Sequence, residues 1–185
     1  MRVSRAAMEQ SHERIVEGAS RLLRERGFEK TSVADVMEAA GLTHGGFYRH
    51  FETKDALLAA AIRAAFTQVT GPMQRNVQER APLEARVAYH NYYLSDEHLG
   101  FAGAACPVAT LAGDMARAGP ELKSSFGNGI KQMLETVALA HAGKNEERQT
   151  AAAREFAMLV GAAVIARASD PETAKRVLDA CRPLA

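Results

Sequence analysis

A chain of 185 residues is long enough to bury an ordinary core, so neither disulfides nor a structural metal are needed for stability. Its two cysteines, Cys106 and Cys181, have no CxxC or zinc-type spacing, which argues against a metal or other cofactor and favours a reducing, cytoplasmic location. The sequence has no signal-type start and no run of about eighteen apolar residues, so no membrane partner is expected.

The net charge of +1 excludes a general polyanion binder, but the charge is unevenly distributed. Residues 43–54 form a small basic tip in which Glu52 is the one acid. A local tip of this kind can contact phosphates although the whole molecule is nearly neutral. Its basic and histidine side chains are His44, Arg49, His50 and Lys54.

Helical periodicity dominates and alternating segments are absent, so the sequence predicts an all-α fold with about nine helices. The first helix is predicted from about Glu9 to Arg26, with Gly27 as its C-terminal stop. Ser32 and the acid three residues later have the spacing of a capping box, which opens a short helix that ends at Gly41.

Thr43 is placed to cap a third helix that runs to about Arg49, and Thr53 is placed to cap a fourth. The glycine and proline within residues 70–73 predict a boundary near residues 67–72. The predicted domains are residues 1–68, the head, and residues 69–185, the body.

In the body, Pro107, Pro120 and Pro171 each stand where a first-turn proline opens a helix. Residues 102–106 and 143–147 are predicted as loops. The predicted body helices lie near residues 83–95, 107–117, 120–141, 146–168 and 171–181.

Two short helices joined by a turn at Gly41 have the arrangement of a helix-turn-helix, whose second helix contacts DNA. On that helix, Phe47 and Phe51 are expected to point inward. Gly45 and Gly46 each cost about 1 kcal/mol of helix stability, which we interpret as the requirement for close approach of the backbone to DNA. Four residues are then left facing outward, namely His44, Gly45, Tyr48 and Arg49.

Residues 27–58 resemble the DNA-binding head of the tetracycline-repressor (TetR) family of bacterial transcriptional regulators. The resemblance covers about a sixth of the chain. It implies an all-α protein with a three-helix helix-turn-helix head and a C-terminal helical bundle. The matching positions are Gly27, Phe28, Thr31, Ser32, Gly41, Gly46, Phe47, Tyr48, His50, Phe51 and Lys54.

The implied function is that of a homodimeric repressor, not an enzyme, which binds palindromic double-stranded operator DNA and is released by a small-molecule effector. The sequence does not distinguish repression from activation or identify the effector, the operator or the target genes. The structural alternative for each candidate contact is a surface or capping role. The predicted DNA contacts are Thr31, Ser32, Thr43, His44, Gly45, Gly46, Tyr48, Arg49, His50 and Lys54.

The resemblance also implies dimerisation through the last two long helices, near residues 146–168 and 171–181. The first of these contains small residues that permit close helix contact, with Phe156, Leu159 and Val164 as larger neighbours. Packing within one chain is the alternative. The small residues are Ala151, Ala152, Gly161, Ala162 and Ala163.

An effector pocket is predicted around Tyr89 and Tyr93, which lie one helical turn apart with His90 beside them. Met115, Phe126, Met133 and Phe156 are candidates for its apolar lining. Ordinary core packing is the alternative for all of these residues.

Cys106 directly precedes Pro107, so its thiol is predicted at a helix cap, where backbone amides favour a thiolate. A redox or electrophile sensor acting through Cys106 is therefore an alternative within the same family, and an inert buried cysteine is the other interpretation. A remote alternative is a cysteine-dependent enzyme with His90, His98 or His141 as base. Nothing in the spacing of these residues indicates that geometry.

Overall fold

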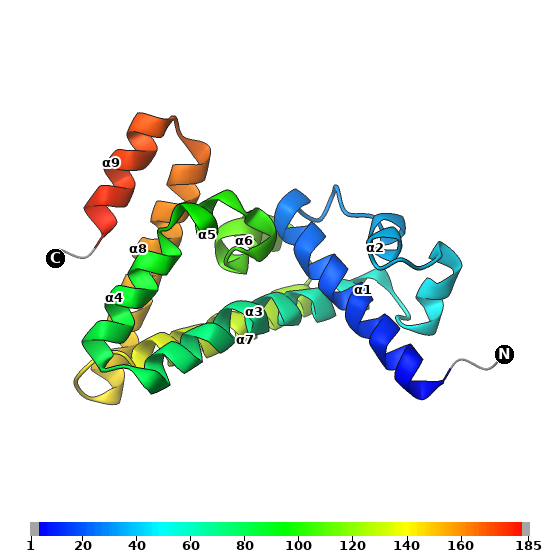
Figure 1. Cartoon of the computed structure of the whole chain (residues 1–185), viewed down its shortest axis with the longest axis horizontal. Helices are drawn as coiled ribbons and strands as arrows, with labels where there is room; N and C mark the ends of the chain where they lie inside the picture. Colours follow the sequence, from blue (N-terminus) through cyan, green and yellow to red (C-terminus); the bar gives the residue numbers. More distant parts are fainter. Residues whose placement is uncertain (1–3, 183–185) are drawn as a thin grey trace.

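The computed structural model describes residues 4–182, and this range contains nine α-helices, two 3₁₀ helices and no strand (Figure 1). The prediction of an all-α fold with about nine helices is therefore confirmed. The elements are α1 (Arg5–Arg26), α2 (Val33–Ala39), the 3₁₀ helix η1 (His44–Arg49), α3 (Lys54–Glu79), α4 (Pro82–Tyr93), α5 (Asp96–Gly100), the 3₁₀ helix η2 (Ala102–Ala104), α6 (Pro107–Arg117), α7 (Pro120–Ala138), α8 (Asn145–Ala168) and α9 (Pro171–Cys181).

The head consists of α1, α2, η1 and the first half of α3, and α8 and α9 lie at the opposite end of the molecule (Figure 1). Its local signals act as predicted. The hydroxyl of Ser32 accepts a hydrogen bond from the amide of Asp35, and the Asp35 carboxylate accepts one from the amide of Ser32, which completes the capping box. Gly27 and Gly41 have φ angles of +78° and +69°, which favour glycine at both turns.

The third head helix differs from the prediction. It is a 3₁₀ helix, in which the amide of Gly46 donates to the carbonyl of Thr43 over 2.9 Å, and the Thr43 side chain makes no capping hydrogen bond. Two adjacent glycines disfavour a regular α-helix over so short a segment. The segment is held by burial of Phe47 instead.

The predicted break at residues 70–73 is wrong, because α3 runs without interruption from Lys54 to Glu79. Pro72 has no amide hydrogen, so the Gln68 carbonyl loses its helical donor, at a cost of about 3 kcal/mol. Burial of Thr70 and Met73 and the packing of α3 along α7 offset that cost. The predicted domain boundary at residue 68 thus falls inside a helix.

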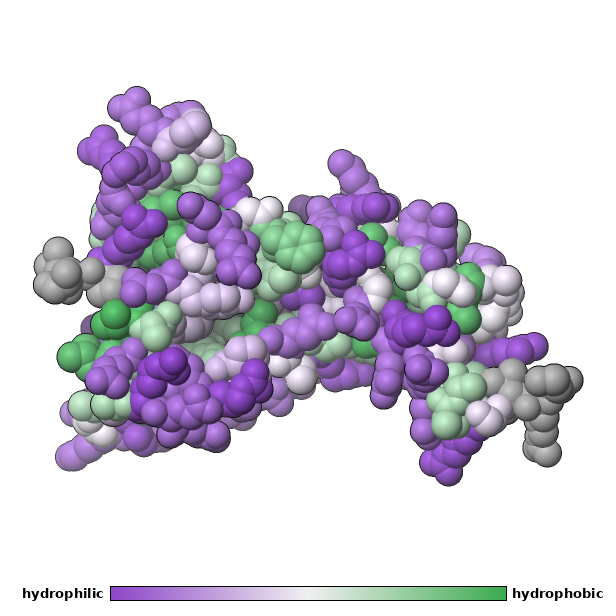
Figure 2. Space-filling view, viewed as in Figure 1, coloured by the Kyte–Doolittle hydropathy of each residue, from purple (hydrophilic) through white to green (hydrophobic). Residues whose placement is uncertain are grey.

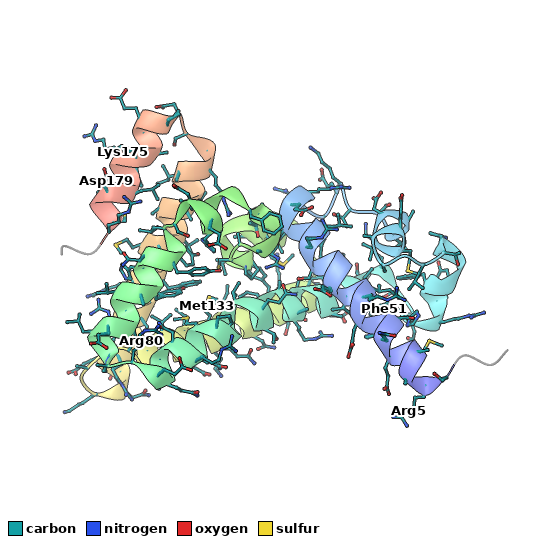
Figure 3. All side chains as sticks on the ribbon, in the orientation of Figure 1. Arg5, Phe51, Arg80, Met133, Lys175 and Asp179 are labelled. Carbon is teal, nitrogen blue, oxygen red and sulfur yellow. The ribbon has the colours of Figure 1, made fainter. Side chains whose placement is uncertain are left out.

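Two groups of buried side chains stabilise the fold. The first joins Phe51 and the rest of the head core to Leu111, Met115, Leu122 and Phe126 of α6 and α7. The second lies in the body and contains Met133 (Figure 3). The head therefore shares one core with the helices that contact it.

The helices α3 and α7 approach closely at Gly129. A Cβ atom on this residue would lie 2.2 Å from the Phe66 ring, and that ring packs edge-on against Phe126 with centroids 5.3 Å apart. Only glycine fits here without a shift of a buried aromatic side chain.

Two short helices that the sequence does not predict, α5 and η2, occupy the segment between α4 and α6. Ser95 caps α5 by accepting a hydrogen bond from the amide of His98, and His98 is itself buried. None of the helices between residues 4 and 182 has the length and apolar character to cross a bilayer.

Candidate nucleic-acid interface

The inner face of η1 is fixed by aromatic side chains. Phe47 and Phe51 are 2% and 7% exposed, and their ring centroids lie 5.9 Å apart. The ring of His12 on α1 stacks on Phe51 with a centroid distance of 4.7 Å. The prediction that the two phenylalanines point inward is confirmed, and they set which side of η1 faces solvent.

The outer face of η1 carries exposed groups suited to DNA. Tyr48 is 74% exposed, and its ring meets Phe47 edge-on at 5.2 Å, so the hydroxyl projects from a supported ring. Lys54 is exposed at the first residue of α3. Hydroxyl, imidazole, guanidinium and ammonium groups can contact phosphates and base edges together. The other exposed predicted contacts are Thr43, His44, Gly45 and Arg49.

The two adjacent glycines have different surroundings. No atom lies within 4 Å of the position that a Cβ atom of Gly45 would occupy, so this residue leaves open space on the outer face. A Cβ atom on Gly46 would instead lie 3.5 Å from the Cε atom of Met37 in α2. Of the two glycines, Gly45 therefore has the clearance that the predicted DNA contact requires, whereas Gly46 faces the head core.

The prediction that Thr31 contacts DNA is wrong, because this residue is buried. It is 1% exposed, and its hydroxyl donates to the carbonyl of Gly27 over 2.7 Å, so it stabilises the turn after α1. Ser32 is exposed, and its hydroxyl lies 2.6 Å from the Asp35 carboxylate. This hydrogen bond lowers the pKa of Asp35, and Ser32 stays a predicted contact.

His50 is half-buried at the end of η1. Burial lowers the pKa of His50, and the nearby His12 and Arg49 lower it further. The imidazole is therefore mainly neutral at pH 7, and in its predicted DNA contact it would supply a hydrogen bond rather than a charge.

Comparison with known proteins agrees with this geometry. Residues 15–61 match the family described as bacterial regulatory proteins, tetR family. The head of the chain therefore matches the TetR family. The matched residues include α2, η1 and the second half of α1, so the match falls on the head.

Curated relatives match this chain over short segments. The chain is 34% identical over 73 residues to the HTH-type transcriptional repressor KstR2 of Rhodococcus jostii, covering 37% of this chain and 36% of that protein. It is 37% identical over 54 residues to the uncharacterized HTH-type regulator YerO of Bacillus subtilis, covering 29% of this chain and 19% of that protein. The matches thus span about a fifth to a third of these relatives' lengths.

Solved structures match the whole TetR-family fold. The reduced form of NemR from E. coli superposes with a TM-score of 0.78 at 17% identity, covering 95% of this chain and 99% of that chain. A TetR-family regulator from Cytophaga hutchinsonii gives a TM-score of 0.78 at 20% identity, covering 98% and 95%. At these identities the likeness concerns the fold.

The predicted effector residues of the body are all buried, but they fall into separate groups. Met115 and Phe126 belong to the core shared with the head. Tyr89 lines a cavity of about 200 Å³ between α3 and α4, with Pro72, Met73 and Tyr92 among its neighbours. The remaining candidates lie in or beside the body core, namely His90, Tyr93, Cys106, Met133 and Phe156.

Cys106 occupies the cap of α6 as predicted, but its thiol is 1% exposed and makes no capping hydrogen bond. Burial raises the pKa of the Cys106 thiol, so the expected thiolate is not favoured. The nearby His98 accepts a hydrogen bond from the Cys106 backbone amide over 3.0 Å and does not act on the thiol. This arrangement argues against both the sensor and the cysteine-enzyme hypotheses.

A charged cluster in the body was not foreseen from the sequence. The buried Glu155 carboxylate lies 2.8 Å from Arg86, 3.0 Å from His90 and 3.3 Å from His141. The hydrogen bonds from His90 and Arg86 outweigh burial and lower the pKa of Glu155. His90 is therefore engaged in holding α4 against α8 rather than free to line a pocket.

Proposed function

We propose that this TetR-family protein is a homodimeric transcriptional repressor that binds a palindromic operator and is released by a small molecule. The observation that carries the proposal is the exposed outer face of η1, where Tyr48 is supported by Phe47, together with the exposed Lys54 at the start of α3. In a dimer, two such heads separated by about 34 Å, or a related spacing, would reach successive major grooves.

Exposed apolar residues on α8 support dimerisation. Met158, Val164 and Ile165 are 39%, 43% and 45% exposed, and the position of Gly161 among them has open space. Figure 2 shows apolar side chains between the polar ones around α8 and α9. A second copy of this surface would bury these side chains.

The residues that support dimerisation overlap only in part with those that the sequence suggested, since Gly161 and Val164 belong to both sets. Several of the proposed small residues face the chain's own core, so they serve packing within one chain. The buried ones are Ala152, Ala162 and Ala163.

Two hydrogen bonds across the junction between head and body support coupling to an effector. Arg24 of α1 donates to the carbonyl of Ala105 over 3.2 Å, and the amide of Phe28 donates to Asp114 of α6 over 3.1 Å. A ligand that disturbs these contacts would change DNA affinity measurably. The coupling free energy between binding of the ligand and binding of DNA is typically about 1 to 3 kcal/mol.

DNA binding is tested by titrating the protein against the DNA upstream of its own gene. We expect Lys54→Ala to weaken binding about tenfold and to lower the slope of affinity against salt by about 1, because one phosphate contact is lost. Fluorescence anisotropy at several salt concentrations measures both quantities.

The matched control for this experiment is Lys144→Ala, which removes an exposed lysine at the start of α8, far from the head. It should leave DNA affinity within about twofold of the parent value. Absence of binding by the parent protein at low salt, or equal effects of the two substitutions, would contradict the proposed role of the head.

Gly45→Ala tests the clearance on the outer face separately. The added methyl group meets open space in the protein, so we expect a gain in stability of up to about 1 kcal/mol. DNA affinity or sequence preference should change, because the methyl group points toward the DNA. Gly46→Ala, whose added methyl group faces Met37 in the head core, is the control. Unchanged DNA binding by Gly45→Ala would show that the open space at Gly45 is not needed for DNA binding.

The dimer is tested by Val164→Glu, which places a charge in the exposed apolar stripe of α8. We expect the dissociation constant of the dimer to rise about a hundredfold, because a buried charge would lack a partner. Sedimentation at a series of concentrations measures it. Leu83→Glu on α4, where the leucine is 68% exposed, is the control, and a monomeric parent protein would refute this interface.

A further inference from the structure

A cleft of about 590 Å³ lies where the head meets the body, and we call it the junction cleft. It is bounded by α1, the end of α2, the middle of α3, the end of α4 and the segment around η2. Figure 1 shows the C-terminal part of α1 beside the segment that leads into α6. This volume is typical of sites for small organic ligands.

The junction cleft contains a buried cation without a carboxylate partner. Arg24 is 5% exposed, and its four hydrogen bonds go to neutral oxygens of Ser20, Gln68 and Ala105. Among the residues that the structure describes, no carboxylate lies within 4.0 Å of its guanidinium. One of the five N–H groups of a guanidinium is thus left over.

Burial without a neutralising partner is unfavourable for this side chain. Burial lowers the pKa of the Arg24 guanidinium to about 10, although the nearby Cys106 and Glu25 raise it. Arginines in protein interiors normally pair with carboxylates, since a buried charge is costly unless it is compensated. An anion inside the cleft would supply that compensation.

The other lining residues give the cleft a positive electrostatic character. Arg14 and Arg21 also line it, and Glu17 is the one carboxylate among the described lining residues. Arg21 is paired with Glu25 at 3.2 Å, which leaves Arg14 and Arg24 without a carboxylate partner in the described part of the chain. An anionic ligand is therefore favoured over a neutral or cationic one.

The walls of the cleft are partly apolar. Tyr92 and Phe101 are 50% and 54% exposed, and Val69, Ala39 and Ala104 complete the apolar lining. Exposed aromatic side chains beside a buried cation suit a molecule with an apolar body and one charged end. A free inorganic anion would leave these aromatic side chains in water.

We propose that the junction cleft binds a small organic acid, with its carboxylate on Arg24 and its apolar body against Tyr92 and Phe101. The bound acid contacts α1 of the head and the η2 segment of the body at once, so it fixes their relative position. The action of the acid as an effector rests on the proposed repressor function. The binding of the acid to the cleft does not depend on that function.

Binding is tested with the full-length protein and benzoate, phenylacetate and octanoate as probes, with benzamide as the neutral counterpart of benzoate. Calorimetric titration at constant ionic strength should detect the acids and not benzamide. Inorganic phosphate distinguishes a general anion site from a site for organic acids. Phosphate binding as tight as that of the acids would overturn the assignment of ligand class.

Two substitutions locate the site. Arg24→Met removes the cation while keeping an unbranched side chain, and we expect the dissociation constant of the acids to rise about tenfold or more. Ala104→Phe fills the cleft from an exposed position and should have the same effect without changing the buried core. Arg26→Gln, at an exposed arginine of α1 outside the cleft, should leave affinity within about twofold.

Several results would overturn the proposal. These are no binding of any of the three acids, equal binding of benzamide, or acid binding that survives both Arg24→Met and Ala104→Phe in folded protein. DNA titration gives an independent result. If the protein binds the acids but no DNA, the acid site in the junction cleft is supported and the repressor function is refuted. If it binds DNA but none of the acids, the repressor function is supported and the acid site is refuted.

Discussion

Replacing His98 with alanine is expected to lower the free energy of unfolding by about 3 kcal/mol. The ring nitrogen Nδ1 lies 2.7 Å from the Tyr93 carbonyl, and Nε2 accepts from the Cys106 amide over 3.0 Å. His98 is 4% exposed, so its removal leaves two backbone groups buried without partners, and each such group costs about 1 to 3 kcal/mol.

Urea unfolding followed by circular dichroism measures this loss. His44→Ala, at an exposed histidine, is the matched control and should change stability by less than about 0.5 kcal/mol. A loss below about 1 kcal/mol for His98→Ala would mean that water replaces the imidazole at both backbone groups.

The same histidine makes stability depend on pH. Burial lowers the pKa of His98, with a further lowering by Arg167, and burial likewise lowers the pKa of His141. Protonation of Nε2 would also remove the acceptor of the Cys106 amide. The unfolded state therefore binds more protons as the pH falls below about 6.5, so stability declines there. Unfolding at a series of pH values should show a smaller decline for His98→Ala.

We expect Gly129→Ala to destabilise the protein by about 2 kcal/mol, although alanine is the better helix former. The added methyl group would lie 2.2 Å from the Phe66 ring, and overpacking of this kind costs about 1 to 3 kcal/mol or more. The gain in helix propensity of about 1 kcal/mol offsets only part of the strain.

Gly127 on the same helix provides the control. It is exposed, and a Cβ atom there meets nothing within 4 Å, so Gly127→Ala should stabilise the protein by up to about 1 kcal/mol. Urea denaturation should therefore separate the two variants by about 3 kcal/mol. Equal stability of the two would show that α3 and α7 separate readily at Phe66.

The head could be predicted from the sequence because its signals are local. The capping box at Ser32, the glycine turns and the inward aromatics of η1 each depend on residues within a few positions of one another. Burial of Thr31 depends on the turn around it as well, but its hydroxyl could equally have faced solvent. Sequence alone could not choose between these orientations.

The body was predicted less well, because its details depend on contacts between distant residues. Pro72 signals a break, yet packing against α7 keeps α3 helical through it. The partners of Glu155 come from two separate segments, α4 and the turn after α7, and Arg24 meets Ala105 across 81 positions. Small residues on α8 suggest close packing but not which side packs within the chain.

The continuity of α3 has a mechanical consequence. Its 26 residues, at about 1.5 Å each, make a rod about 39 Å long, with Lys54 at one end and Asn76, bonded to the Ala85 carbonyl, near the other. A tilt of about 5° about the body end moves Lys54 by about 3 Å, the length of one hydrogen bond. The helix would thus act as a lever arm that converts a small tilt at the body into a larger displacement at the proposed DNA-binding surface.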